Sequence, residues 1–294
     1  MRKLARFALV LGLAISGPAF ADKSADASYK EGLAYKAEGK TDEAIKSLEE
    51  TVATNPKHGK AWAALGSLYK TKKDLPKSID AYEHATQLIT KDAVLWVNLG
   101  TAYANTGKLD QALVALTTAC KLDPKDAETR AYLGTVQRKK NDYANAIINL
   151  EMAVKLKPDN ADWQHNLGVA YRFAKRDDDA VKAFSAAIAI NGNDPTYHFD
   201  LAVAYRRKQE VDKAIPEYEK ATSLDPGNAD GWFDLGFMYK ENHDNDKAID
   251  AFKHYLDLKK GKDADGEKRI TEECQSLGGD CGKDSKKKPP PKKK

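Results

Sequence analysis

The stretch "WVNLGTAYANTG", residues 96–107, contains the pattern that indicates the fold. It places Trp96, Leu99, Gly100 and Tyr103 along one helical face and ends in Thr-Gly, a pair typical of turns. The pattern returns at a spacing of 34 residues, where Gly100 has the counterparts Gly32, Gly66, Gly134, Gly168, Ala202 and Gly236. The stretch is therefore one unit of an internal repeat, and we expect its recurring residues to build the fold.

Seven such units follow one another without insertion or deletion. They cover residues 25–58, 59–92, 93–126, 127–160, 161–194, 195–228 and 229–262. Within each unit, two apolar blocks at helical spacing flank a polar turn near the fifteenth position, which predicts a pair of antiparallel helices. The recurring Gly and Ala would let the two helices approach closely, and a Pro near the end of four units would stop the second helix.

The motif W-x2-L-G-x2-Y, followed by a later Ala and a terminal Pro, resembles the tetratricopeptide repeat family. The resemblance implies an all-α, tetratricopeptide-repeat solenoid, a right-handed superhelix of helix-turn-helix pairs, over residues 22–262. Pro216 departs from the pattern. We interpret it as lying early in a second helix, where its missing N–H has no intrahelical partner in any case.

Residues 263–282 predict one further helix that caps the repeats. In "GEKRITEECQSLGG", residues 266–279, Ile270, Cys274 and Leu277 share one face, and Gly278 with Gly279 would close the helix. At the other end, Glu31 stands where later repeats have Leu, as expected of a first repeat without a neighbour. Because both ends are predicted to be capped, we expect a monomer and no end-to-end assembly.

The two ends of the sequence carry targeting and charge signals. Residues 1–21 combine a basic start, a short apolar core and "AFA", which predicts a signal peptide cleaved near Ala21 and a periplasmic or secreted protein. The alternative for this segment is a buried N-terminal helix. Residues 283–294 hold seven Lys, one Asp and three Pro, a composition typical of a disordered tail. The tail either binds an anionic envelope surface or only keeps the protein soluble.

Nothing in the sequence predicts catalysis. The six histidines show no metal-ligand or nucleophile–base spacing, and there is no phosphate-binding loop, so we expect no enzyme, no cofactor and no metal. Cys120 is interpreted as a small buried residue. Cys274 and Cys281 either form a disulfide across the Gly-Gly bend, which an oxidising compartment favours, or remain two thiols.

The candidate binding residues follow from the repeat register. In this family the first helices line a concave groove that holds a peptide or a partner's helix. The residue after the recurring Tyr is basic in six of seven repeats and predicts a ladder of positive charge: Lys36, Lys70, Arg138, Arg172, Arg206 and Lys240, strengthened by Lys139 and Arg207. The neighbouring candidates are the ring-bearing residues His165, Phe199, Phe233 and Phe237 and the amides Asn98 and Asn166.

These residues predict a scaffold that binds an acidic and apolar segment of another protein, in a role such as envelope assembly or secretion. The alternative for the basic ladder is ordinary solvated helix surface. A second function is an envelope-structural tether, in which the Lys-rich tail holds the solenoid on an anionic surface or polymer. We expect no nucleic-acid partner, because the chain carries an export signal and no aromatic residues interleave the lysines of the tail.

Overall fold

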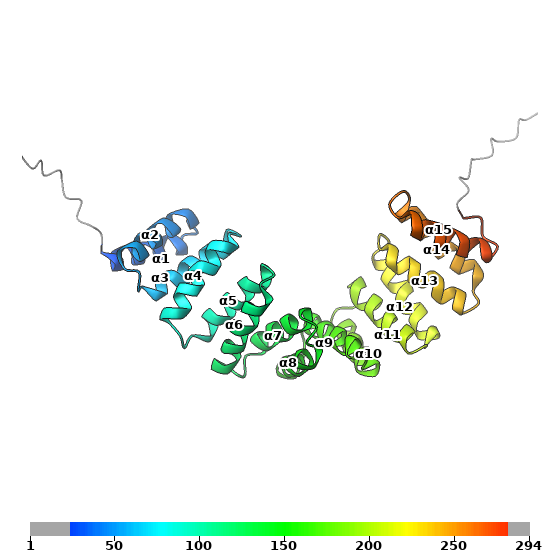
Figure 1. The fold of residues 1–294 in the computed structure, drawn as a ribbon, viewed down its shortest axis with the longest axis horizontal. Coiled ribbons are helices and arrows are strands. Elements are labelled where there is room, and N and C mark those ends of the chain that lie inside the picture. Colours follow the sequence, from blue (N-terminus) through cyan, green and yellow to red (C-terminus); the bar gives the residue numbers. More distant parts are fainter. Residues whose placement is uncertain (1–23, 282–294) are drawn as a thin grey trace, which may run out of the picture. The chain divides into compact units, whose positions relative to one another are not determined.

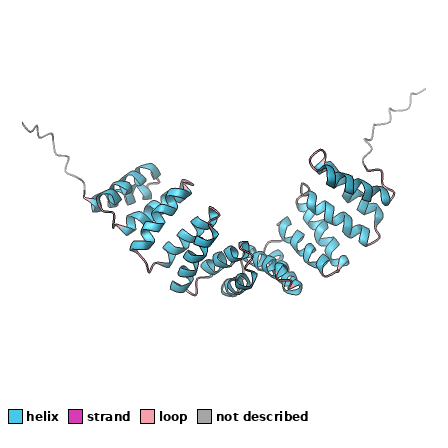
Figure 2. Ribbon diagram, in the orientation of Figure 1, coloured by secondary structure: helices cyan, strands magenta, loops and turns pink. Residues whose placement is uncertain are grey.

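The structure is a computed structural model that describes residues 24–281. Within these residues all regular structure is α-helical and no strand occurs, as Figure 2 shows. Figure 1 labels the helices in chain order: α1 (Ala25–Ala37), α2 (Thr41–Thr54), α3 (Gly59–Thr71), α4 (Leu75–Leu88), α5 (Ala93–Asn105), α6 (Leu109–Leu122), α7 (Ala127–Lys139), α8 (Tyr143–Leu156), α9 (Ala161–Phe173), α10 (Asp177–Ile190), α11 (Pro195–Arg207), α12 (Val211–Leu224), α13 (Ala229–Glu241), α14 (Asn245–Lys259) and α15 (Ala264–Ser276). The predicted all-α architecture of helix pairs is confirmed.

The turn inside each helix pair contains one residue with a left-handed backbone. These residues, which recur every 34 positions, are Gly39, Lys73, Gly107, Asn141, Lys175, Gln209 and His243, with φ between 60° and 76°. Only two of the seven are Gly, although the left-handed region costs other residues roughly 1–2 kcal/mol. The geometry of the helix pair therefore imposes this conformation, and the residue type adapts to it.

Small residues at the centre of each first helix allow the second helix of the pair to pack directly against it. A Cβ added to Gly236 would lie 2.4 Å from the ring of Phe252, and one added to Gly66 would lie 2.7 Å from Tyr82. Phe252 and Tyr82 are fully or almost fully buried. A larger residue at either glycine would force the two helices apart, because packed interiors leave no room for an extra carbon.

A recurring hydrogen bond joins successive repeats. The hydroxyl of Tyr69 donates to Glu49 at 2.5 Å, and that of Tyr171 donates to Glu151 at the same distance. Tyr239 makes the equivalent bond to Glu219. In each case the tyrosine lies on a first helix and the glutamate on the second helix of the repeat before it. The recurring Tyr is thus a structural residue that fixes how repeats stack.

The chain divides into two compact units, the first ending at Leu95 and the second beginning at Trp96. The core of the first unit includes Leu48, Leu65 and Tyr69. The second unit contains a cluster around Phe184 and another that extends to Ile270. Each unit therefore has a hydrophobic core of its own.

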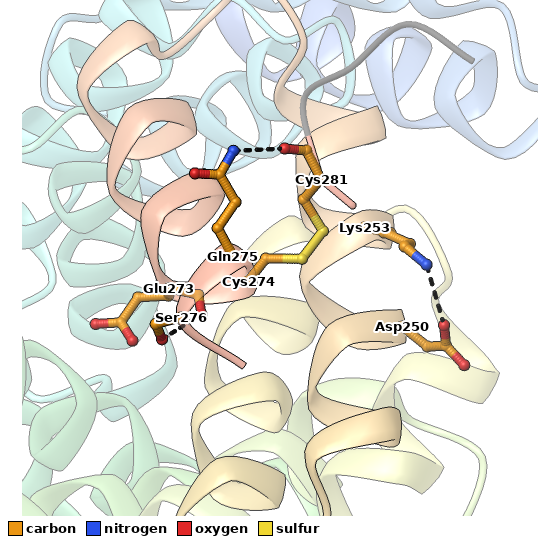
Figure 3. Close-up of a disulfide and its surroundings, with 7 residues drawn as sticks. All are labelled: Asp250, Lys253, Glu273, Cys274, Gln275, Ser276 and Cys281. Carbon is orange, nitrogen blue, oxygen red and sulfur yellow. Dashed lines mark hydrogen bonds and ion pairs between the residues drawn. A yellow bond between two sulfur atoms is a disulfide. The ribbon is translucent and has the colours of Figure 1, made fainter. Parts of the chain in front are cut away.

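The last helix, α15, packs on α14 and closes the second unit. Ile270 and Cys274 are fully buried, and Gly278, with φ +89°, ends the helix. A disulfide joins Cys274 to Cys281, as Figure 3 shows, and the amide of Gln275 donates to the carbonyl of Cys281 at 3.4 Å. The chain after the helix is thus tied back to it by one covalent bond and one hydrogen bond.

Two details differ from what the sequence suggested. Pro216 is the sixth residue of α12, so the prediction that its N–H would lack an intrahelical partner was wrong. Glu31 is not simply turned to solvent, because it accepts a hydrogen bond from Ser47 of α2 at 2.9 Å.

None of the helices in residues 24–281 is long and apolar enough to cross a membrane. The predicted signal peptide, 1–21, and the Lys-rich tail, 283–294, lie outside the described residues.

Candidate functional site

The basic residues predicted to form one ladder lie in different environments. In the first unit, Lys36 and Lys70 lie in the last turns of the first helices α1 and α3. Both side chains are exposed and make no ion pair with the described residues. In the second unit, the residues at the same repeat position are half-buried: Arg138, Arg172, Arg206 and Lys240. Burial makes charge pairing far more important for this second group, because a desolvated charge is costly without a partner.

Three of these four cations pair with a carboxylate on the first helix of the next repeat or on the cap α15. Arg172 of α9 lies 3.3 Å from Asp200 of α11, and Arg206 of α11 donates to Asp234 of α13 at 2.6 Å. Lys240 of α13 pairs with Glu273 of α15. These contacts link one first helix to the next, or to the cap, so they hold the repeats together as well as shaping the surface.

Arg138 is the exception among the half-buried cations. It makes no ion pair or hydrogen bond with the described residues, and its Nε, like that of Arg172, is buried without an acceptor. Burial lowers the pKa of Arg138, and the nearby Arg172 lowers it further while Asp200 opposes the shift. The guanidinium therefore carries a desolvation cost that no carboxylate in direct contact offsets.

The two additional basic candidates lie apart from these pairs. Arg207 donates from its Nε to Asp177, the first residue of α10, at 2.7 Å. Lys139 is exposed and has no ion pair within residues 24–281. The structure therefore does not bring Arg207 together with Asp234, the partner of its neighbour Arg206.

The predicted ring-bearing residues are partly covered by neighbouring helices. The Nε2 of His165 lies 2.7 Å from Asp200, so this carboxylate is shared between His165 and Arg172. Phe199 packs edge-on against Tyr218 with ring centroids 5.7 Å apart. The rings of Phe233 and Phe237 are 4.9 Å apart, and the guanidinium of Arg269 lies 5.4 Å from each. The cap α15 thus covers part of the aromatic surface that the sequence predicted to be free.

The two predicted amides have no side-chain hydrogen bond among the described residues. Asn98 is half-buried on α5, where its backbone carbonyl accepts a bond from Thr101. Asn166 is half-buried on α9 and lines a cavity of about 580 Å³ between α7 and α9. This cavity is also lined by Glu128, Tyr132, Thr135, Asp162 and Trp163. Asn166 is therefore the predicted amide that has both free hydrogen-bonding groups and space beside it.

We call the following set the first-helix surface of the second unit: Arg138, His165, Asn166, Arg172, Phe199, Asp200, Arg206, Phe233, Asp234, Phe237 and Lys240. Sequence reasoning missed Asp200 and Asp234. A signal for both was present, because each follows its arginine partner by 28 residues. Burial raises the pKa of Asp234, although Arg206 opposes that rise. This surface therefore alternates positive and negative groups where the sequence predicted positive charge alone.

Within the described residues, no group of three or more metal-ligating side chains is close enough to hold an ion. The Cys120 thiol is free and buried, and burial raises its pKa. A raised pKa favours the protonated thiol, which is the unreactive form. This cysteine therefore behaves as a core residue, as predicted.

Comparisons with known proteins agree with the repeat architecture. Among solved structures, MamA is 29% identical over 56% of this chain and 97% of its own, with a TM-score of 0.54. MamA from Desulfovibrio magneticus RS-1 is 24% identical over 58% of this chain and 97% of its own, with a TM-score of 0.55. YrrB, a TPR protein, is 21% identical over 67% of this chain and 99% of its own, with a TM-score of 0.58. The last two likenesses concern the fold alone.

Two family models match the sequence. The tetratricopeptide repeat model matches residues 217–250, and the model of the cilia and flagella-associated protein 70 C-terminal domain matches residues 10–232, well over half of the chain. No curated protein matches it closely enough to count as a relative. The predicted tetratricopeptide-repeat solenoid is thus confirmed, and the chain belongs to the family of the cilia and flagella-associated protein 70 C-terminal domain.

Proposed function

We propose that the protein is a protein–protein interaction scaffold. Its first-helix surface in the second unit binds an extended segment of a partner, and the partner's side chains complete the polar groups that this surface leaves unpaired. The proposal assigns no catalysis. His165 shares its carboxylate partner with Arg172, an arrangement that suits a contact between repeats.

The observation that carries the proposal is the cavity between α7 and α9, which shares Asn166 with the first-helix surface. It combines aromatic surface from Tyr132 and Trp163 with hydrogen-bonding groups from Thr135 and Asn166. Binding sites for extended segments use this combination, in which apolar surface gives affinity and a few polar groups fix orientation. A volume of about 580 Å³ is large enough for several side chains of a bound segment.

The comparisons support this proposal without extending it. MamA and YrrB have the same kind of fold, and YrrB is a TPR protein with an unusual peptide-binding site. That description belongs to YrrB. For this chain it supplies a precedent for placing a peptide on such a fold, while the residues that would do so are its own.

The proposal is tested by crosslinking in the cells that make the protein. A photoreactive amino acid is placed at Thr135, which lines the cavity, and in a matched chain at Lys182 of α10, whose side chain is 79% exposed. We expect one discrete protein adduct from Thr135, mapped by mass spectrometry to a single segment of the partner, and none of this adduct from Lys182. Equal labelling from both positions, or no adduct from Thr135, would contradict a binding role for this surface.

Export and tethering form a separate part of the proposal, supported by the composition of residues 1–21 and 283–294. We propose that the mature protein begins at Asp22 in the periplasm or outside the cell and serves envelope assembly or secretion. N-terminal sequencing of protein recovered from fractionated cells tests this directly. As the second candidate function, the seven lysines of the tail would tether the protein to an anionic surface. Deletion of residues 283–294 would then release it from the envelope fraction while the Thr135 adduct is retained.

A further inference from the structure

Two ion pairs on the first-helix surface join residues that are 28 positions apart. Arg172 pairs with Asp200, and Arg206 pairs with Asp234. In both cases the arginine lies in the last turn of one first helix and the aspartate near the middle of the next. The repeat register therefore supplies each of these half-buried arginines with a carboxylate.

The same spacing counted from Arg138 leads to Asn166. Asparagine has nearly the shape of aspartate but no charge, so the register offers Arg138 an amide where the next two repeats offer a carboxylate. The carboxylate whose charge acts on Arg138 is Asp200, which already binds His165 and Arg172. Two permanent positive charges thus share one carboxylate around this point, and both arginines keep a buried Nε–H without an acceptor.

Space for an external group reaches the helical turn that precedes Arg138, although Arg138 itself does not line it. Thr135 and Asn166 both line the cavity between α7 and α9. Arg138 follows Thr135 by three residues on α7, and residues three apart lie on the same face of a helix. A group bound in the cavity beside Thr135 can therefore reach toward the guanidinium of Arg138 without any displacement of the helices.

We propose that an Asp or Glu side chain of the bound partner segment occupies this position, accepting hydrogen bonds from the guanidinium of Arg138 and the amide of Asn166. The inference rests on the proposed function and specifies its ligand. The partner's carboxylate takes the place that Asp200 and Asp234 take in the following repeats. A planar guanidinium suits this role because it binds both carboxylate oxygens at once.

The charges that line the cavity restrict which anion fits. Three carboxylates, those of Asp126, Glu128 and Asp162, outnumber the single ammonium of Lys157. Glu128 precedes Arg138 by ten residues, or about 15 Å along the helix. A polyanion such as a nucleic acid would be repelled there. A protein segment with one acidic residue at the Arg138 end, and apolar or basic residues about four or five positions away, matches both ends.

The inference is tested by selecting a library of random peptides displayed on phage against the full chain and, in parallel, against the Asn166→Asp variant. We expect the native protein to enrich peptides with Asp or Glu at one fixed position, and Asn166→Asp, which supplies its own carboxylate, to lose that preference. The enriched peptide is then synthesised and its Kd measured by fluorescence anisotropy. Asn166→Asp and Arg138→Gln should each weaken binding roughly tenfold to a hundredfold.

Arg176→Gln is the matched control, because this arginine pairs with Asp179 in an exposed position and its loss should leave the Kd unchanged. A peptide with its acidic residue changed to Gln should bind the native protein and Arg138→Gln equally. If peptides compete for the cavity but show no preferred acidic position, this inference is overturned while the binding function stands. If no selected peptide depends on the cavity, as judged by a Trp163→Arg variant that stays folded by circular dichroism, both are overturned.

Discussion

The contact between α7 and α9 and the contacts that follow it along the second unit are built on the same register but differ in charge. Between α9 and α11 the half-buried arginine meets Asp200, and between α11 and α13 it meets Asp234. Between α7 and α9 the equivalent residue is Asn166, and Arg138 has no carboxylate in contact. We call the first two filled seams and the last one the open seam.

This difference indicates that the same repeat position can stabilise the fold in one repeat and bind a ligand in another. A half-buried ion pair removes two charges from water and is favourable only with good geometry and further hydrogen bonds. Both carboxylates of the filled seams make a further hydrogen bond, since Asp200 also binds His165 and Asp234 also accepts from Tyr218 at 3.2 Å, although the Nε of Arg172 is buried without an acceptor. The open seam leaves the cost of its buried cation unmet, and a ligand that meets it gains affinity.

The largest effect is expected from breaking a filled seam. Asp200→Ala leaves Arg172 and His165 half-buried without their shared acceptor and removes the attraction that offsets the charge of Arg138. Loss of one partner of a buried ion pair costs about 3–5 kcal/mol in the free energy of unfolding. Urea denaturation measures the loss, and hydrogen exchange of α9 and α11 locates it.

Asn166→Ala is the matched variant at the open seam. It removes a side chain of nearly the same size that makes no hydrogen bond within the described residues, so it should change the stability by only about 0.5 kcal/mol. If Asp200→Ala and Asn166→Ala lower the free energy of unfolding by the same amount, the carboxylate of the filled seam contributes no more to stability than the amide of the open seam.

An effect smaller than that of Asp200→Ala is expected at the cap. The contact between α13 and α15 contains the pair of Lys240 with Glu273, and a disulfide lies nearby. Reduction opens a loop of seven residues, which should lower the stability of α15 by about 2 kcal/mol. Hydrogen exchange of the α15 amides before and after reduction measures this change, with the α7 amides of the same sample as the control. Unchanged protection of α15 would show that packing of Ile270 holds the cap without the disulfide.

A gain in stability is expected when the open seam is converted into a filled one. Asn166→Asp gives Arg138 a carboxylate at the spacing used by the next two repeats, which should raise the free energy of unfolding by about 1 kcal/mol. The gain should vanish in the double variant Arg138→Gln/Asn166→Asp, because the interaction energy belongs to the pair. A double-mutant cycle in urea that shows no coupling would contradict the assignment of Asn166 as the partner position of Arg138.

Most of the fold was predictable from the sequence because the signals are local and recur. The 34-residue spacing of Gly100 and its counterparts predicted the helix pairs, and the polar fifteenth position predicted turns that the structure places at residues such as Lys73 and Asn141. The position of Pro216 within α12 was not predictable to the residue, because a helix boundary can shift by one or two residues without changing the repeat pattern.

The candidate site was predictable only in part. The basic positions were found, and a search at 28 residues would also have found Asp200 and Asp234. Glu273 could not be found in this way, since α15 lies outside the repeats and has a register of its own. The cavity beside Asn166 could not be predicted from the sequence either. Its volume depends on the spacing of α7 and α9 and on which side chains leave that space empty.

The last expected effect is a pH dependence that belongs to a filled seam. Burial raises the pKa of Asp234 above its usual 3.8, despite Arg206 beside it. The folded chain then holds this proton at a pH where the unfolded chain has lost it. The contribution of Asp234 to stability is consequently greatest below 3.8 and falls as the pH rises through the folded-state pKa, by at most about 1.4 kcal/mol per pH unit.

Asp234→Asn removes this titration, so above pH 3.8 its urea midpoint should fall less steeply with rising pH than that of the native chain. Asp257→Asn, at an exposed position of α14, is the control and should leave the slope unchanged. The opposite slope difference would mean that attraction by Arg206 outweighs burial.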